Sequence, residues 1–89
     1  MDIRQIALWI IDTDRRLITL KAFAKHRTLH PAEIAKKSGR SIQNISRALH
    51  EMEKKGIVKS IDEKTTWKKY LLMTKGEKVL DEVSKILKG

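Results

Sequence analysis

The chain has 89 residues, a length that predicts one small domain with a modest hydrophobic core. It contains no cysteine, which excludes disulfides and thiolate metal sites and fits a reducing cytoplasm. No apolar run approaches the roughly 20 residues that a membrane-spanning helix requires. The N-terminal stretch also lacks the basic start of a signal peptide, so we expect a cytoplasmic protein.

The net charge of +9 is concentrated in the middle of the chain. Residues 25–75 carry thirteen basic and five acidic side chains, a net charge of +8, whereas residues 1–24 carry +1 and residues 76–89 are neutral. Such a local positive field favours a polyanionic partner, with nucleic acid first and an anionic membrane surface second. The plainer alternative is a lysine-rich surface that binds no such partner.

The first third of the chain contains one predicted helix, preceded by a segment that the sequence leaves open between helix and strand. Residues 2–11 have apolar side chains at helical spacing, but further apolar residues interrupt the pattern. If this segment is helical, its apolar face consists of Ile3, Ile6, Ala7 and Ile10. Asp12 suits the N-cap of the predicted helix, which runs to about Lys25.

Two more helices, joined by a short turn that contains glycine, are predicted next. His30 stands at the N-cap of a helix that ends near Ser38, and Gly39 can supply the turn. Ser41 can cap the following helix, which covers residues 41–55.

The pattern then changes to two short β-branched and aromatic stretches separated by a polar loop, which predicts a β-hairpin over about residues 57–73. Thr74 and Glu77 form a capping box for a final helix. The sequence therefore predicts a mostly helical α+β domain. The apolar stripe of its last helix consists of Val79, Leu80, Val83, Ile86 and Leu87.

The helix predicted over residues 41–55 has two contrasting sides. At about 100° per residue, one side forms a core stripe of Ile42, Ile45, Leu49 and Met52. The opposite side carries Arg40, Gln43, Arg47, His50 and Lys54, with Asn44 and Glu51 beside them. Arginine pairs with guanine edges, and asparagine or glutamine with adenine edges, so this side suits DNA base readout. The alternative is an ordinary solvated helix face.

Four short motifs follow one another in the second half of the chain: PAEIA (31–35), SR (46–47), MEKKG (52–56) and MTKG (73–76). In this order they resemble the winged helix-turn-helix of MarR-type and related archaeal transcriptional regulators, over about residues 14–86. The last motif matches inexactly, because its glycine follows the threonine by two positions where the family has three.

The resemblance implies that helix 41–55 lies in the DNA major groove and that hairpin 57–73 is a wing on the DNA backbone. The DNA-binding residues would be Arg40, Ser41, Gln43, Asn44, Arg47, Lys36, Lys37, Lys54, Lys64, Lys68 and Lys69. Related regulators pair through their terminal helices, which implies a homodimer; packing within one chain is the alternative. The dimer interface would contain Ile3, Ile6, Ile10, Leu80, Val83 and Leu87.

The sequence shows no pattern for catalysis or for a metal. His26 and His30 have metal-ligand spacing, but Pro31 interrupts the helix that such a site would need. No nucleophile elbow, carboxylate pair or glycine-rich phosphate loop occurs, so we expect neither an enzyme nor a cofactor. The sequence predicts a sequence-specific regulator that binds double-stranded DNA. The alternatives are a winged-helix protein–protein interaction module in a transcription or replication assembly, and a binder of structured RNA.

Overall fold

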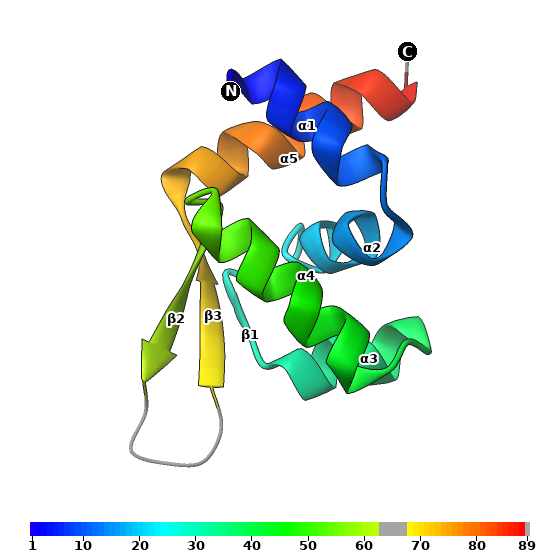
Figure 1. Ribbon diagram of the computed structural model, residues 1–89, viewed down its shortest axis with the longest axis vertical. Helices are drawn as coiled ribbons and strands as arrows, with labels where there is room; N and C mark the ends of the chain where they lie inside the picture. The colour runs from blue at the N-terminus through cyan, green and yellow to red at the C-terminus, as the bar shows by residue number, and fades with distance from the viewer. Residues whose placement is uncertain (63–67, 89) are drawn as a thin grey trace.

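The computed structural model of the protein describes residues 1–62 and 68–88. In these residues the chain forms five helices and a three-stranded sheet, which confirms the mostly helical α+β winged-helix architecture (Figure 1). The elements in chain order are α1 (Ile3–Ile11), α2 (Asp14–Ala22), β1 (Thr28–Leu29), α3 (Pro31–Ser38), α4 (Ile42–Lys54), β2 (Val58–Asp62), β3 (Lys68–Leu72) and α5 (Thr74–Lys88).

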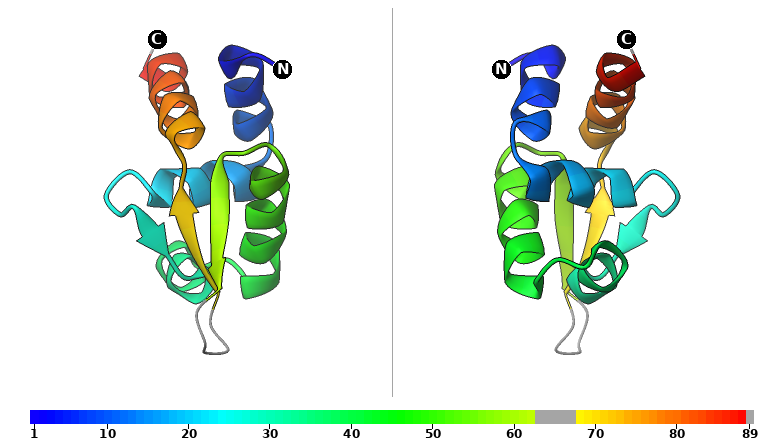
Figure 2. Two further views of the ribbon diagram at one scale, coloured as in Figure 1. Left: turned by 90° about the vertical axis from the view of Figure 1, so that its left-hand side faces the viewer. Right: turned by 90° about the vertical axis from the view of Figure 1, so that its right-hand side faces the viewer.

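The molecule is elongated, and its two ends are built differently. The helices α1 and α5 pack side by side at one end, where both chain termini lie (Figures 1 and 2). The β2–β3 hairpin extends toward the opposite end, where α3 and the start of α4 also lie. Between these ends, α2 packs against α4, and α4 packs against α3 and β2.

The sheet joins the predicted hairpin to the short extended piece that precedes α3. Its strand order is β1-β3-β2, with antiparallel pairing throughout. Leu29 pairs with Tyr70, which in turn pairs with Ser60 on the other side. The wing strands are therefore fixed to the start of α3 through β1, a connection that the sequence pattern did not specify.

Segment 1–11 is helical, which decides between the two predicted alternatives. Asp2 accepts a hydrogen bond from the Gln5 backbone N–H at 2.8 Å, and the Gln5 side chain accepts one from the Asp2 N–H at 3.0 Å. The predicted N-cap of the second helix is wrong. Asp12 ends α1 with helical dihedrals, whereas Thr13 has the extended backbone that an N-cap requires. The helix α2 also ends at Ala22, earlier than predicted.

The predicted boundaries of α3 and α4 are confirmed. His30 is the N-cap of α3, and its N–H donates to the Glu33 carboxylate at 2.9 Å. Gly39 ends this helix with a φ of 70°, a conformation that costs glycine least. Ser41 caps α4, because its Oγ accepts the Asn44 N–H at 3.1 Å. The helix α4 thus starts from a defined turn.

The start of α5 differs from the prediction. Thr74 is the first residue of the helix rather than its N-cap, and the Glu77 N–H donates to the Met73 carbonyl. The Glu77 carboxylate instead accepts from Arg27 at 2.7 Å. Gly76 is buried in this turn. A Cβ atom at this position would lie 2.3 Å from the Ile57 carbonyl oxygen, so no other residue fits without a shift of the chain. Close packing, and not capping, explains the glycine in this first turn.

Candidate nucleic-acid interface

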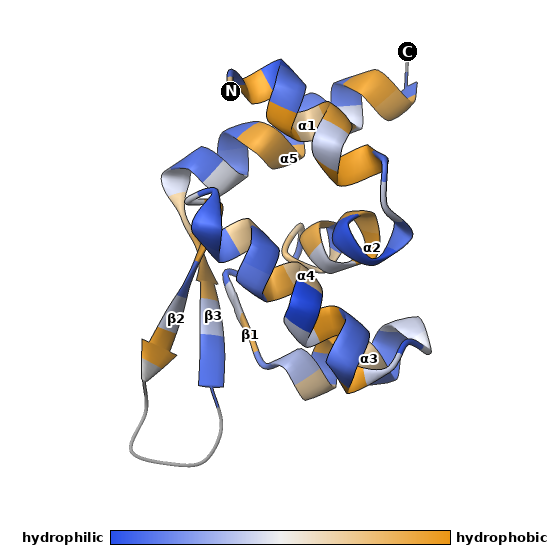
Figure 3. Cartoon of the chain, in the orientation of Figure 1, coloured by the Kyte–Doolittle hydropathy of each residue, from blue (hydrophilic) through white to orange (hydrophobic). Residues whose placement is uncertain are grey.

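One side of α4 is fixed in the core. Ile45, Ala48, Leu49 and Met52 have no exposed surface, so this side cannot rotate without breaking the packing against α2, α3 and β2. The opposite side is exposed, including Gln43, Arg47 and Lys54. Figure 3 shows hydrophilic and hydrophobic residues alternating along α4. The helix is therefore held rigidly while it presents polar side chains to solvent.

The predicted core position of Ile42 is wrong, because 55% of this residue is exposed. It is the first residue of α4, and its side chain projects about 60° away from that of Ile45 around the helix axis. Periodicity gives the direction of a side chain but does not say whether another element covers it. Ile42 therefore belongs to the exposed first turn, beside Gln43 and Asn44.

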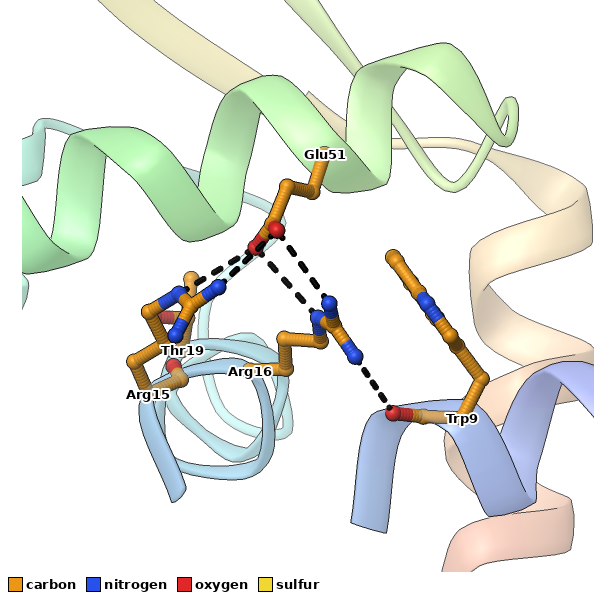
Figure 4. Close-up of polar contacts among 5 residues, drawn as sticks. All are labelled: Trp9, Arg15, Arg16, Thr19 and Glu51. Atoms are coloured by element: carbon orange, nitrogen blue, oxygen red, sulfur yellow. Dashed lines mark hydrogen bonds and ion pairs between the residues drawn. The ribbon is translucent and has the colours of Figure 1, made fainter. Parts of the chain in front are cut away.

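Glu51 was predicted to flank the exposed side of the helix, but it is half-buried against α2. Its carboxylate accepts from Nε and Nη2 of Arg15, at 3.2 and 2.9 Å, and from Nε and Nη2 of Arg16, at 3.3 and 3.2 Å (Figure 4). The hydrogen bonds from Arg16, which outweigh desolvation and are reinforced by Arg15, lower the pKa of Glu51 to about 2. This ionised cluster anchors α4 to α2.

A second anchor connects α4 to the wing. Glu53 accepts from the backbone N–H of Ser60 at 2.9 Å and from its hydroxyl at 2.8 Å. These two bonds hold the pKa of Glu53 below its usual value. Tyr70 is buried in the neighbouring strand, and burial raises the pKa of its phenol. The helix α4 and the wing are thus fixed relative to each other.

Arg40, the predicted DNA-binding residue in the turn before α4, has a partner within the chain. Its Nε lies 3.0 Å from Oδ2 of Asp14, and its Nη2 donates to the same oxygen. Asp14 is the first residue of α2, so the ion pair crosses from α2 to the turn before α4. Both side chains are largely exposed, which leaves Arg40 accessible from solvent.

The structure places most of the other predicted DNA-binding residues in three groups. Ser41 caps α4, and Gln43, Asn44 and Arg47 lie in its first two turns; all four residues are exposed. Lys36 and Lys37 are exposed in the last turn of α3, where the Lys37 Nζ lies 3.4 Å from His26 Nε2. On β3, Lys68 is exposed and Lys69 is half-buried. Lys54 lies at the far end of α4, and Lys64 lies outside the described residues.

The predicted dimer residues are mostly internal. Ile6, Ile10 and Val83 are 1% exposed or less, in the core to which α1 and α5 contribute, so they are not available to a second chain. Ile3 and Leu80 are partly buried against the same core. Of the six, Leu87 alone is largely exposed, at 47%. These three residues thus pack within one chain, and the homodimer itself stays a prediction.

Within residues 1–62 and 68–88, no three His, Cys, Asp or Glu side chains gather as metal ligands would. His30 lies against the wing instead, with Nδ1 3.2 Å from the Lys68 carbonyl oxygen. None of the described helices is both long and apolar enough to cross a membrane.

The chain is similar in sequence to one curated protein and similar in fold to DNA-associated proteins of known structure. It is 39% identical over 64 residues to Transcription factor E of Nanoarchaeum equitans (strain Kin4-M). This alignment covers 70% of the chain and 45% of the relative, so the chain spans less than half of that protein.

Solved structures confirm the winged helix-turn-helix fold. A mutant of TubR, a protein of type III plasmid segregation, has a TM-score of 0.83 at 17% identity, covering 100% of this chain and 96% of its own. A point mutant of MepR from Staphylococcus aureus, bound to an oligodeoxyribonucleotide, has a TM-score of 0.78 at 26% identity, covering 97% and 68%. A family model matches residues 12–84, which is most of the chain. The protein therefore belongs to the HVO_A0114 family.

Proposed function

We propose that the protein is a transcription regulator that binds double-stranded DNA in a sequence-specific manner, with α4 in the major groove. The observation that carries this proposal is the exposed first half of α4. Gln43, Asn44 and Arg47 project there from a helix whose other side is locked in the core. Rigid presentation of such side chains is what base readout requires, because each bidentate pair depends on geometry.

Basic residues stand on both sides of this helix face. Lys36 and Lys37 lie on α3, which precedes this helix, and Lys68 lies on the wing strand β3. Phosphates on either side of the groove would therefore meet positive charge. The likeness to MepR supports this reading, since that protein is bound to DNA in its structure. Transcription factor E, the relative in sequence, is named for a role in transcription.

The proposed regulator is a homodimer, which would present two recognition helices to a symmetric site. Because Ile6, Ile10 and Val83 are internal, the contact would use the apolar groups that are exposed at the α1–α5 end. These groups include Leu8 and Leu87, which are 48% and 47% exposed.

The proposed function is tested by titrating a fluorescent duplex, selected by the protein from a random pool, at several salt concentrations. An unselected duplex of equal length is the control. We expect tighter binding to the selected duplex and a steep fall in affinity with salt, because neutralised phosphates release counterions. Equal affinity for the two duplexes would reject sequence specificity, and no duplex binding at low salt would reject DNA as the partner.

One observation favours the alternative of a protein–protein interaction module. Ile42 exposes a large apolar side chain on the face that would meet DNA, and exposed apolar groups are typical of protein-binding surfaces. The flanking positions nevertheless carry Gln43, Asn44 and Arg47, and these polar side chains suit base edges better than an apolar partner. The same titration separates the two functions.

A further inference from the structure

Ile42 is unusual among the exposed apolar residues of this molecule. Within residues 1–62 and 68–88, the other large apolar side chains that are largely exposed are Met1, Leu8 and Leu87. These three lie in or next to α1 and α5, at the opposite end from the start of α4 (Figures 1 and 2). Among the described residues, Ile42 is thus the large apolar side chain exposed at the end of the molecule that we propose to bind DNA.

The position of Ile42 is well defined. It follows Ser41, whose Oγ accepts the Asn44 N–H at 3.1 Å and so fixes the first turn of α4. Its own side chain is β-branched, which restricts it to few rotamers in a helix. About 100° around the helix axis stands Gln43, a predicted base-reading residue. A rigid apolar group therefore stands next to the polar groups proposed to read bases.

The chemistry of the major groove suggests a partner for such a group. Its floor carries hydrogen-bond donors and acceptors at every base pair, but the C5 methyl of thymine is its apolar feature, and apolar side chains contact it. Burying a methyl group against Ile42 would remove apolar surface of both partners from water. A cytosine at the same place would offer no methyl and would leave the side chain against a polar edge.

We propose that Ile42 is a specificity-determining residue that selects thymine by contact with its methyl group. This inference rests on the proposed binding of α4 in the major groove. The contact of Ile42 would add an apolar interaction to base readout, which otherwise consists of hydrogen bonds from Gln43, Asn44 and Arg47. The preferred DNA would then have thymine at the base pair that faces the first turn of α4.

Deoxyuridine, which lacks only the C5 methyl of thymine, tests the proposal. Each thymine of the selected duplex is replaced in turn by deoxyuridine, and affinities are measured by fluorescence anisotropy with the full chain. We expect one thymine per half-site whose replacement weakens binding about fourfold, the effect of one buried methyl-sized group. The Ile42→Ala variant should lose a similar factor on the thymine duplex and no longer distinguish the two bases at that position.

Two further variants keep this result interpretable. Ile42→Val retains the branched methyl groups and should keep most of the preference for thymine. Lys21→Ala shortens an exposed side chain of α2, outside the proposed DNA and dimer contacts, and should leave the discrimination between thymine and deoxyuridine unchanged. Circular dichroism should show that all three variants are folded, because neither position belongs to the core.

The outcomes separate the inference from the proposed function. Specific duplex binding that is indifferent to deoxyuridine at every position, or a preference that persists in Ile42→Ala, would overturn the role of Ile42 and leave DNA binding intact. A chain that binds no duplex would overturn both, and Ile42 would then be a candidate for protein contact.

Discussion

The guanidinium of Arg16 lies 4.0 Å from the centre of the Trp9 ring, and its Nη1 donates to the Trp9 carbonyl at 3.1 Å. The same guanidinium donates to Glu51 on α4 (Figure 4). One side chain of α2 therefore joins α1 to α4, through a cation–π contact and charge-assisted hydrogen bonds. The terminal helices and the candidate DNA-binding helix are mechanically connected at this point.

Glu51→Gln should destabilise the protein at neutral pH by about 1–3 kcal/mol, because two arginines lose an ionised acceptor. The folded-state pKa of Glu51 is about 2, below its ordinary value of 4.5. The stabilisation is therefore complete above pH 4.5 and is lost as pH falls toward 2. Urea unfolding of both proteins should show a difference in unfolding free energy at about pH 7 that shrinks at about pH 3.

Asp81→Asn is the matched control for this prediction. Its partner Lys85 lies one turn away at 3.3 Å, and both side chains are about 70% exposed. Exposed pairs of this kind contribute little, so unfolding should change by less than about 0.5 kcal/mol. An equal effect of the two substitutions would show that Glu51 is no more than a surface charge.

Gly76→Ala should destabilise the protein, although alanine is the better helix former by about 1 kcal/mol. The new Cβ would lie 2.3 Å from the Ile57 carbonyl oxygen and 2.6 Å from Leu72 Cδ1. The clash with backbone cannot be relieved by a rotamer change, so we expect a loss of at least about 2 kcal/mol in thermal or urea unfolding. A stabilised variant would show that α5 does not pack this closely.

At Gly39→Ala the expected loss has another cause and a smaller size. No atom lies within 4 Å of a Cβ built there, so alanine would not clash. It would, however, have to adopt the positive φ of 70° that glycine has at this position. The loss should be about 1 kcal/mol, the cost of a left-handed conformation for a residue with a side chain. Comparing the two variants separates backbone conformation from packing.

Leu8→Glu and Leu87→Glu should shift the protein toward the monomer if the terminal helices form a dimer contact. A charge at the apolar α1–α5 end would have to be desolvated on pairing, which opposes association. Sedimentation equilibrium measures the change, and Ile42→Glu at the opposite end is the control. A wild-type chain that sediments as a monomer at tens of micromolar would rule out this dimer.

Asp14→Asn should tighten binding to any duplex about two- to fivefold at low salt, an order-of-magnitude expectation for one removed negative charge near phosphates. The substitution breaks the ion pair between Asp14 and Arg40, so the Arg40 guanidinium could pair with a phosphate instead. Asp81→Asn changes the net charge equally but lies on α5. Weaker binding by Asp14→Asn would mean that Asp14 orients Arg40 for contact rather than neutralising it.

Local chemistry made much of the fold predictable. His30 and Ser41 at N-caps and Gly39 in a left-handed turn each act within a few residues, so the sequence alone locates the two helices of the helix-turn-helix. Asp12 failed as a cap because the preceding helix continues through Ile11, which leaves Thr13 as the first extended residue. A residue between two adjacent helices can end the first or begin the second, and its preference for an N-cap position does not settle which.

Relations between distant elements were not predictable in this way. Ile42 has the periodicity of a core residue but is exposed, and Glu51 has the polarity of a surface residue but is held by Arg15 and Arg16. Both outcomes depend on which element packs beside α4, and periodicity carries no information about that. The exposed side of the helix was predictable because it needs no partner in the chain.

Arg47→Ala and Lys68→Ala together separate base readout from backbone contact. Arg47 is exposed on α4 one turn after Gln43, where base edges would lie, whereas Lys68 is exposed on the wing strand β3. Loss of Arg47 should cost about 1–3 kcal/mol on the selected duplex and much less on an unselected one, because one bidentate base contact disappears. Loss of Lys68 should weaken both duplexes by similar factors and lower the salt slope by about one unit.

Anisotropy titrations of both variants on both duplexes, each at several salt concentrations, give the four affinities and the slopes. Lys21→Ala, which removes an equally exposed cation from α2, is the control and should leave the ratio of the two affinities unchanged. Arg47 contacts a phosphate rather than a base if its loss weakens both duplexes equally and reduces the salt slope. It is a solvated surface residue if nothing changes. In either case Gln43 and Asn44 would carry the hydrogen-bonded readout. Replacing either of them by alanine should then weaken binding to the selected duplex more than binding to the unselected one.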